Sequence, residues 1–167
     1  MTCLPLLTTF TQLRPEVVQQ LIKSIPSCKP VVREGLARAL AVAAVRETYE
    51  ETGLVFGTLG VDNVLTPRLD CMDLLGRSIT PESKPIRYSA RVFTADAEHA
   101  TGEIRSNGEL EDLHWRPIAE AFTLPMVDVT QWMLMELFRR YNAGDKSAFT
   151  HTPIFQYVAD KPNISYE

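Results

Sequence analysis

One long helical segment limits what this chain can fold into more than any other stretch. Pro26 and Pro30 interrupt the sequence, and the segment then runs from about Arg33 to Thr52 without another proline. Gly53 follows directly, and a glycine at this point predicts a left-handed cap that ends the helix. A helix of this length must bury one of its faces against another layer of structure.

Shorter helices and strands are predicted on both sides of this segment. Apolar residues recur at helical spacing after Pro15, and proline favours the first position of a helix, so a short helix is predicted over Pro15–Ile25. Side chains alternate over residues 86–95, which predicts a strand. The remaining predictions are strand-like residues 74–79, an irregular loop over 96–112, a strand over 113–115, a helix over 117–122, a helix over 128–142, a strand over 153–158 and an irregular segment over 1–12. This interspersion of helices with strands predicts an α/β or α+β layered fold.

The helix over 128–142 carries boundary signals of its own. Asp128 is predicted to be its N-cap, with Gln131 completing a capping box, and Val127 is placed to pack on Trp132 as a hydrophobic staple. Gly144 is predicted to close the helix. Both ends of this helix are therefore predicted.

Composition limits the class of protein. The chain has 167 residues, of which 45% are hydrophobic and 23% charged, and it shows no repeat, linker or low-complexity tract, so one domain is predicted over residues 1–167. The formal charge of −4 argues against binding a nucleic-acid polymer. Three widely spaced cysteines, no apolar run of about 20 residues and no basic N-terminal signal predict a cytoplasmic protein that does not enter a membrane.

The residues that carry chemistry lie at the end of the long helix. A helix advances about 100° per residue, so Glu47, Glu50 and Glu51 fall within an arc of about 100°. These carboxylates repel one another, and they lie at the helix end where negative charge is unfavourable. A bound cation relieves both costs, and oxygen ligands at this density suit Mg²⁺ or Mn²⁺. The alternative is an ordinary solvated face, which is the usual role of a charge run.

A longer string around these glutamates resembles a known motif. Residues 46–54 read Arg-Glu-Thr-Tyr-Glu-Glu-Thr-Gly-Leu and resemble the second half of the Nudix box, R-E-U-x-E-E-x-G-U, where U is aliphatic; the departure is Thr48. The resemblance implies a metal-dependent hydrolase of nucleoside diphosphates linked to another moiety, built as an α/β/α sandwich with a mixed sheet. It also implies that Glu47, Glu50 and Glu51 ligate Mg²⁺ or Mn²⁺, that Glu50 is catalytic, and that Arg46 orients the carboxylates through a salt bridge.

A second segment resembles the same family. Residues 109–118, with Glu120 and Ala121 after them, resemble the later E-x-x-x-x-x-W-x-P segment of Nudix proteins. In that family the acidic loop can supply a base or a further metal ligand. Glu109 is the first candidate for this catalytic role and Glu111 is the second. A solvated acidic loop is the alternative for both residues.

The first half of the Nudix box, G-x5-E, is absent. Counting back from Gly53 places Val32 and Arg38 at its fixed positions, and neither replaces a glycine or a glutamate. Some Nudix subfamilies carry an insertion inside the box, and residues 1–32 resemble the remnant of one, ahead of the Nudix helix at 33–54. The chain is then expected to lack the first strands of the sheet, either because its true start lies upstream or because it is a natural short form. A sheet without these strands has an unpaired edge, so a homodimer is expected.

The expected ligand is a small molecule that contains a diphosphate. Arg87 and Arg91 alternate onto one face of the predicted strand, with Ser89 between them, and are candidates to contact phosphates; a solvated face paired with nearby acids is the alternative. Nudix boxes with an insertion are found in acyl-coenzyme A diphosphatases, so coenzyme A esters are one candidate substrate, beside nucleotide sugars and dinucleotides. Two further interpretations stay open: a Nudix-like domain that binds a nucleotide or protein without hydrolysing it, and a truncated product without its own function.

Overall fold

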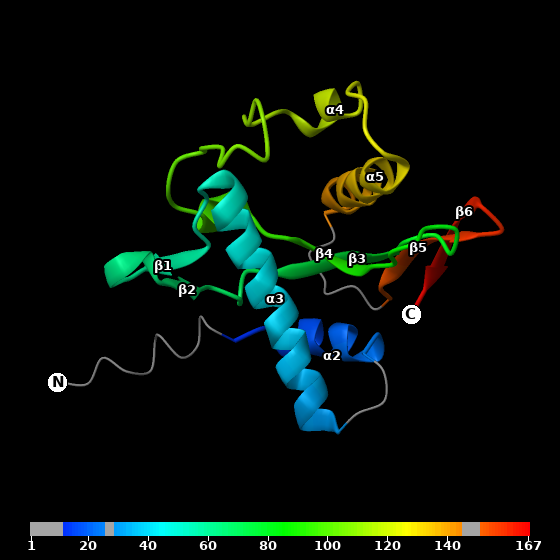
Figure 1. The fold of residues 1–167 in the computed structure, drawn as a ribbon, viewed down its shortest axis with the longest axis horizontal. Helices are drawn as coiled ribbons and strands as arrows, with labels where there is room; N and C mark the ends of the chain where they lie inside the picture. The colour runs from blue at the N-terminus through cyan, green and yellow to red at the C-terminus, as the bar shows by residue number, and fades with distance from the viewer. Residues whose placement is uncertain (1–11, 26–28, 145–150) are drawn as a thin grey trace. The chain divides into compact units, whose positions relative to one another are not determined.

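The computed structural model describes residues 12–25, 29–144 and 151–167 (Figure 1). The chain divides into two compact units, which we describe separately: unit 1 contains the residues up to Asp73 with Thr94–His114, and unit 2 contains Leu74–Phe93 with Trp115–Glu167. The described residues are mixed α/β, with helices and two sheets, one of which combines parallel and antiparallel pairs. The expected irregular segment over 1–12 lies almost wholly outside them, and the single domain stays a prediction.

Unit 1 is built on two helices that pack against each other, α2 (Pro15–Lys23) and α3 (Pro30–Thr52). Pro15 occupies the first position of α2, as predicted. The long helix begins three residues earlier than expected, because Pro30 serves as its first residue instead of separating it from the preceding segment. Its buried residues Ala37, Ala41 and Val45 follow one another at intervals of four and form the stripe that faces the core.

A small hairpin follows α3 in unit 1. Its strands β1 (Gly57–Leu59) and β2 (Leu65–Pro67) pair antiparallel across a short 3₁₀ turn, Val61–Asn63. Neither strand was predicted, because three mostly exposed residues carry no readable alternation. The loop expected over 96–112 is irregular apart from a 3₁₀ turn at Ala97–His99 and one bridge between Val55 and Thr101.

Unit 2 contains the larger sheet, in the order β4-β3-β5-β6. Strands β3 and β5 pair parallel, with Arg77 opposite Ile154, and β5 pairs antiparallel with β6 through a tight turn. The bounds are β3 Asp73–Ile79, β4 Ser89–Thr94, β5 Pro153–Val158 and β6 Lys161–Tyr166. Strand β6 was not predicted, since it is a polar, largely exposed edge strand that contains a proline.

Three predicted boundaries in unit 2 or at its border are wrong. The strand expected over 86–95 spans only Ser89–Thr94. Just before it, the Tyr88 N–H donates to the Thr80 hydroxyl and not to a backbone carbonyl of a neighbouring strand. Residues 113–115 form no strand, since none of the described strands pairs with them.

The helix α5 (Asp128–Asn142) has Val127 as its N-cap, one residue before the expected position. The Asp128 carboxylate instead accepts hydrogen bonds from the Val129 N–H and the Tyr157 hydroxyl.

The core of unit 2 lies where α5 covers one face of the sheet. Leu75, Met133 and Phe155 are buried together there, and Val92 and Trp132 pack against them. The short helix α4 (Ile118–Ala121) precedes α5, and the left-handed Gly144 follows it; both were predicted. The sheet therefore has one face filled by this helix, which leaves the alternating residues of β3 and β4 on the other face.

Candidate functional site

The candidate site from the sequence is the last two turns of α3. Arg46, Glu47 and Glu50 have side chains that are 57%, 52% and 52% exposed, and Glu51 is half-buried. Helical geometry places Arg46, Glu47 and Glu50 on the side away from the buried stripe that ends at Val45, and Glu51 beside that stripe. The helix thus holds Glu47 and Glu50 on its outer face while its inner face anchors it in unit 1.

Arg46 joins two of the three carboxylates. Its Nη2 lies 2.5 Å from Oε1 of Glu47, and its Nε lies 3.5 Å from Oε1 of Glu50. The hydrogen bond to Glu47, followed by the charges of Glu50 and Glu47, raises the pKa of Arg46 above its ordinary value. One guanidinium therefore contacts both Glu47 and Glu50 on the surface of the helix.

The end of α3 is fixed by backbone geometry. Gly53 has a φ of 76°, and its N–H donates to the carbonyl of Tyr49, so the predicted left-handed cap is confirmed. A β-carbon on Gly53 would lie 2.6 Å from the carbonyl oxygen of Glu103 and 2.5 Å from Cγ of Arg105. Since the Arg105 N–H also donates to the Thr52 carbonyl at 2.8 Å, the loop over 103–105 lies directly against the helix end.

This loop adds a residue that sequence reasoning missed. The Arg105 guanidinium lies 5.8 Å from the centre of the Tyr49 ring, and its Nη2 is 3.4 Å from the Tyr49 hydroxyl. A positive charge is favourable at the C-terminal end of a helix. No local pattern could have paired Arg105 with Tyr49, because the two residues are 56 positions apart in the sequence.

The acidic loop residues lie in the exposed part of the same loop. The Glu109 N–H donates to Oδ1 of Asn107 at 2.9 Å, and the Ser106 hydroxyl bonds to the Leu110 carbonyl, so this stretch is held by its own short-range bonds. Both Glu109 and Glu111 have exposed side chains. The structure does not join either residue to the carboxylates of α3 by a described hydrogen bond or ion pair.

Whether a divalent cation can bind at the end of α3 depends on the grouping of its acidic side chains. Over residues 12–25, 29–144 and 151–167, no three acidic, histidine or cysteine side chains are grouped closely enough to hold a metal ion. Magnesium, however, needs only one or two protein carboxylates when water and substrate phosphates supply the other ligands. Glu47, Glu50 and Glu51 offer exposed or half-buried carboxylate oxygens on one helical face, so the donor set suits this ion.

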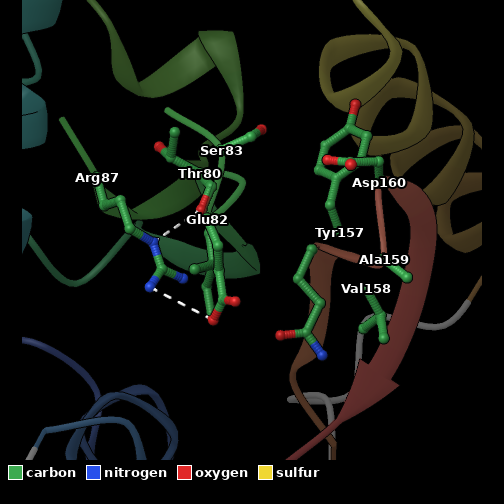
Figure 2. A pocket seen from close by; sticks show the side chains of 10 residues that line it. Thr80, Glu82, Ser83, Arg87, Tyr157, Val158, Ala159 and Asp160 are labelled. Atoms are coloured by element: carbon green, nitrogen blue, oxygen red, sulfur yellow. Dashed lines mark hydrogen bonds and ion pairs between the residues drawn. The ribbon is translucent and has the colours of Figure 1, made fainter. Parts of the chain in front are cut away.

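Arg87 lies in a pocket of about 350 Å³ at one end of the unit 2 sheet (Figure 2). Its Nε donates to the Thr80 carbonyl at 3.3 Å, and its Nη1 lies 3.7 Å from Oε1 of Glu82. Tyr157 and Asp160, from β5 and the turn after it, form the opposite wall. One arginine therefore faces two acidic residues, and this balance disfavours a bare diphosphate.

Arg91 occupies a different environment from Arg87. Its Nη1 donates to the Ser89 carbonyl at 2.6 Å and lies 3.1 Å from the Ser89 hydroxyl, which also accepts from Nε of Arg77 at 2.8 Å. Burial, followed by the charge of Arg77, lowers the pKa of Arg91, and the charge of Glu167 opposes that change. The structure brings Arg77 next to Arg91 at the Ser89 hydroxyl, a contact that the sequence did not predict, while Arg87 and Arg91 stay candidates for phosphate contacts.

Comparisons of the chain with protein-family models, with curated proteins and with solved structures found no match. None of the helices in the described part of the chain is long and apolar enough to cross a membrane.

Proposed function

We propose that this protein is a metal-dependent hydrolase that cleaves the pyrophosphate bond of compounds linked to a nucleoside diphosphate, as Nudix proteins do. The observation that carries the proposal is the end of α3, where Arg46 bridges Glu47 and Glu50. Exposed surface ion pairs add little to stability, so folding alone gives no strong reason to concentrate these charges on one turn. A role in binding a cation that contacts a diphosphate would explain why these charges are concentrated on one turn.

In this proposal Glu47, Glu50 and Glu51 would supply the one or two carboxylates that Mg²⁺ or Mn²⁺ takes from the protein, with water and substrate phosphates as the other ligands. Arg46 would keep Glu47 and Glu50 in a shared orientation. When bound, the divalent ion neutralises diphosphate oxygens and lowers the pKa of a water molecule. Glu50 would accept the proton of the attacking water; from the acidic loop, Glu109 is the first candidate for this role and Glu111 the second. As the water oxygen bonds to phosphorus, the P–O bond of the pyrophosphate bridge would break, and a phosphate-containing product would leave.

We further propose a Nudix-like α/β/α sandwich. The mixed sheet of unit 2, with α5 on one face, supports this architecture. The substrate classes that fit are coenzyme A esters, nucleotide sugars and dinucleotides, and no nucleic-acid polymer is among them.

The proposal is tested by hydrolysis of a panel of these three substrate classes with Mg²⁺ or Mn²⁺, followed by chromatography of the mononucleotide product. Glu50→Gln is expected to lower kcat by about 100-fold or more, since it removes the general base. Glu34→Gln is the matched control, because Glu34 is an exposed glutamate of the same helix far from the candidate turn. Equal rates for the wild type and Glu50→Gln on every substrate would rule the proposal out.

A second candidate function is a Nudix-like domain that binds a nucleotide or a protein without hydrolysing it. The absent G-x5-E half of the box favours this candidate, as does the lack of a preformed metal-ligand group among the described residues. It predicts near-zero rates for the wild type and Glu50→Gln alike, together with tight binding of a nucleotide or protein ligand in equilibrium dialysis.

A homodimer stays part of the proposal. The hairpin β1–β2 has only two strands, and such an isolated pair is marginally stable in water. In the sheet of unit 2, β4 and β6 are the outer strands. Pairing with a second copy of the chain would cover such an edge, and sedimentation equilibrium of the full chain should then show twice the monomer mass.

A further inference from the structure

Two arginines from neighbouring strands meet on the unit 2 sheet. Arg77 lies on β3 and Arg91 on β4, and the hydroxyl of Ser89 is within 2.8 Å of Nε of Arg77 and 3.1 Å of Nη1 of Arg91. A single hydroxyl therefore holds two guanidinium groups close to each other.

Both side chains contact the same hydroxyl group. Val92 packs in the core under α5, and Arg91 precedes it in the strand, so alternation directs Arg91 to the opposite face. Arg77 shares the Ser89 hydroxyl with Arg91, which places its guanidinium beside that of Arg91.

Their closeness has an electrostatic cost. The Arg77 side chain is only 18% exposed, and burial and the Arg77 charge are the two largest causes that lower the pKa of Arg91. The Glu167 carboxylate pairs with Arg77, because its Oε2 lies 3.5 Å from Nη1 of Arg77, and its charge also acts on Arg91. Like charges held together in a partly desolvated place are stabilised by an anion, and two guanidinium forks match the oxygens of a phosphoryl group.

The pocket around Arg87 does not offer the same chemistry. Glu82, whose side chain is 85% exposed, pairs with Arg87, and Asp160 lines the same pocket. A phosphoryl group there would meet one positive charge and two negative ones. Arg87 is therefore the internal control for any effect assigned to Arg77 and Arg91.

We infer that Arg77 and Arg91 form a binding site for a phosphoryl oxyanion, with Ser89 as the residue that positions both guanidinium groups. The inference rests on the proposed function in one respect, namely that the ligand is a compound that contains a diphosphate. Free orthophosphate shares this chemistry, so the test compares the two sources.

The test is calorimetric titration of the full chain with inorganic pyrophosphate and, separately, orthophosphate, in the presence of a chelator. Arg77→Gln and Arg91→Gln should each weaken pyrophosphate binding by about tenfold or more, because each removes a charged hydrogen-bond donor. Arg87→Gln should change the affinity by less than about twofold. Tighter binding of pyrophosphate supports a diphosphate substrate, and equal or tighter binding of orthophosphate supports free phosphate as the ligand.

Two further variants separate binding from folding. Arg77→Lys keeps the charge without the planar fork and should bind better than Arg77→Gln at the same melting temperature. Ser89→Ala should weaken binding, and Ser89→Thr should restore it, because the hydroxyl returns. Absence of pyrophosphate binding by the wild type, or an equal loss in Arg87→Gln, would overturn the inference. Binding that depends on Arg77 and Arg91 in a protein without hydrolysis would leave this site standing while the proposed function fails.

Discussion

Two helices of this protein each carry a cluster of arginine and glutamate side chains, exposed on α3 and largely buried on α5. On α3, Arg46 pairs with Glu47 and Glu50, and all three side chains are more than half exposed. On α5, Glu136 accepts from Arg139 at 2.9 and 3.0 Å and from Arg140 at 2.5 Å. The Glu136 and Arg140 side chains are only 9% and 5% exposed.

The difference teaches that solvation, and not the residue pattern, decides what such a cluster does. Burial tends to raise the pKa of Glu136, but the hydrogen bonds and charges of Arg139 and Arg140 outweigh it and lower the pKa below its ordinary value. Breaking a buried pair is costly, whereas an exposed pair contributes little. The α5 cluster is therefore structural, whereas the ion pairs of Arg46 on α3 contribute little to stability.

The largest loss of stability is expected from a substitution in the buried cluster of α5. Glu136→Ala should lower the free energy of unfolding by about 3 kcal/mol, because the buried Arg140 loses its carboxylate partner. Urea denaturation measures this change. Arg139→Ala is the matched control and should cost much less, since the Arg139 side chain is 67% exposed. A loss below about 1 kcal/mol for Glu136→Ala would show that the buried cluster contributes no more to stability than an exposed one does.

The second prediction concerns the cap that fixes the exposed cluster. Gly53→Ala should destabilise the protein by about 2 kcal/mol, because a residue with a β-carbon is strained at this φ and collides with the loop at Glu103 and Arg105. Gly35→Ala on the same helix should instead stabilise it by about 0.5–1 kcal/mol, since its β-carbon meets open space. Thermal unfolding of both variants checks the two opposite signs. Equal shifts would contradict the role of the cap.

The third prediction uses the pH dependence of the buried cluster. The pKa of Glu136 is lowered in the folded protein, so the unfolded state binds more protons as the pH falls. The contribution of this group to stability is complete above the ordinary glutamate pKa of about 4.3 and is lost as the pH falls through the lowered folded value. Urea titrations between neutral and acidic pH should show this loss. A Glu136→Gln variant should show a flatter profile, and an unchanged profile would count against the assignment.

The smallest expected effect on stability is at the exposed cluster. Glu47→Gln and Glu50→Gln should each change Tm by no more than about 2 °C, because exposed ion pairs contribute little. The same variants should weaken Mn²⁺ binding, which calorimetry with the metal alone can measure. A fall in Tm as large as that of Glu136→Ala would make the α3 cluster structural and remove the main support for the proposed function.

The elements that could be predicted are those with strong local signals. The helices α2, α3 and α5 follow from apolar spacing with proline or glycine at their ends, and strands β3 to β5 follow from their apolar or alternating residues. Strands β1, β2 and β6 were missed because short or polar exposed strands owe their existence to pairing partners elsewhere in the chain. The cap of α5 was misplaced by one residue because Tyr157 binds the Asp128 carboxylate.

The contacts of the candidate site also fall into those that local sequence predicts and those that it does not. The contact of Arg46 with Glu50 follows from helical spacing, since residues four apart are neighbours on a helix. The contacts of Arg77 with Ser89 and of Arg105 with Tyr49 depend on which strands and loops come together, and no pattern within either segment encodes that. Arg87 was grouped with Arg91 because the alternation continues in the sequence beyond the point where the strand begins.

The interleaved order of the two units has a consequence for biosynthesis. The chain passes from unit 1 to unit 2 near residue 73, returns for residues 94–114, and then completes unit 2. Neither unit can therefore be cut out as one continuous fragment. During translation, the first unit stays incomplete until its returning segment has left the ribosome, and β3 must wait for β5, its parallel partner, which is made more than seventy residues later. Nascent chains of intermediate length should therefore expose unpaired backbone and depend on chaperones.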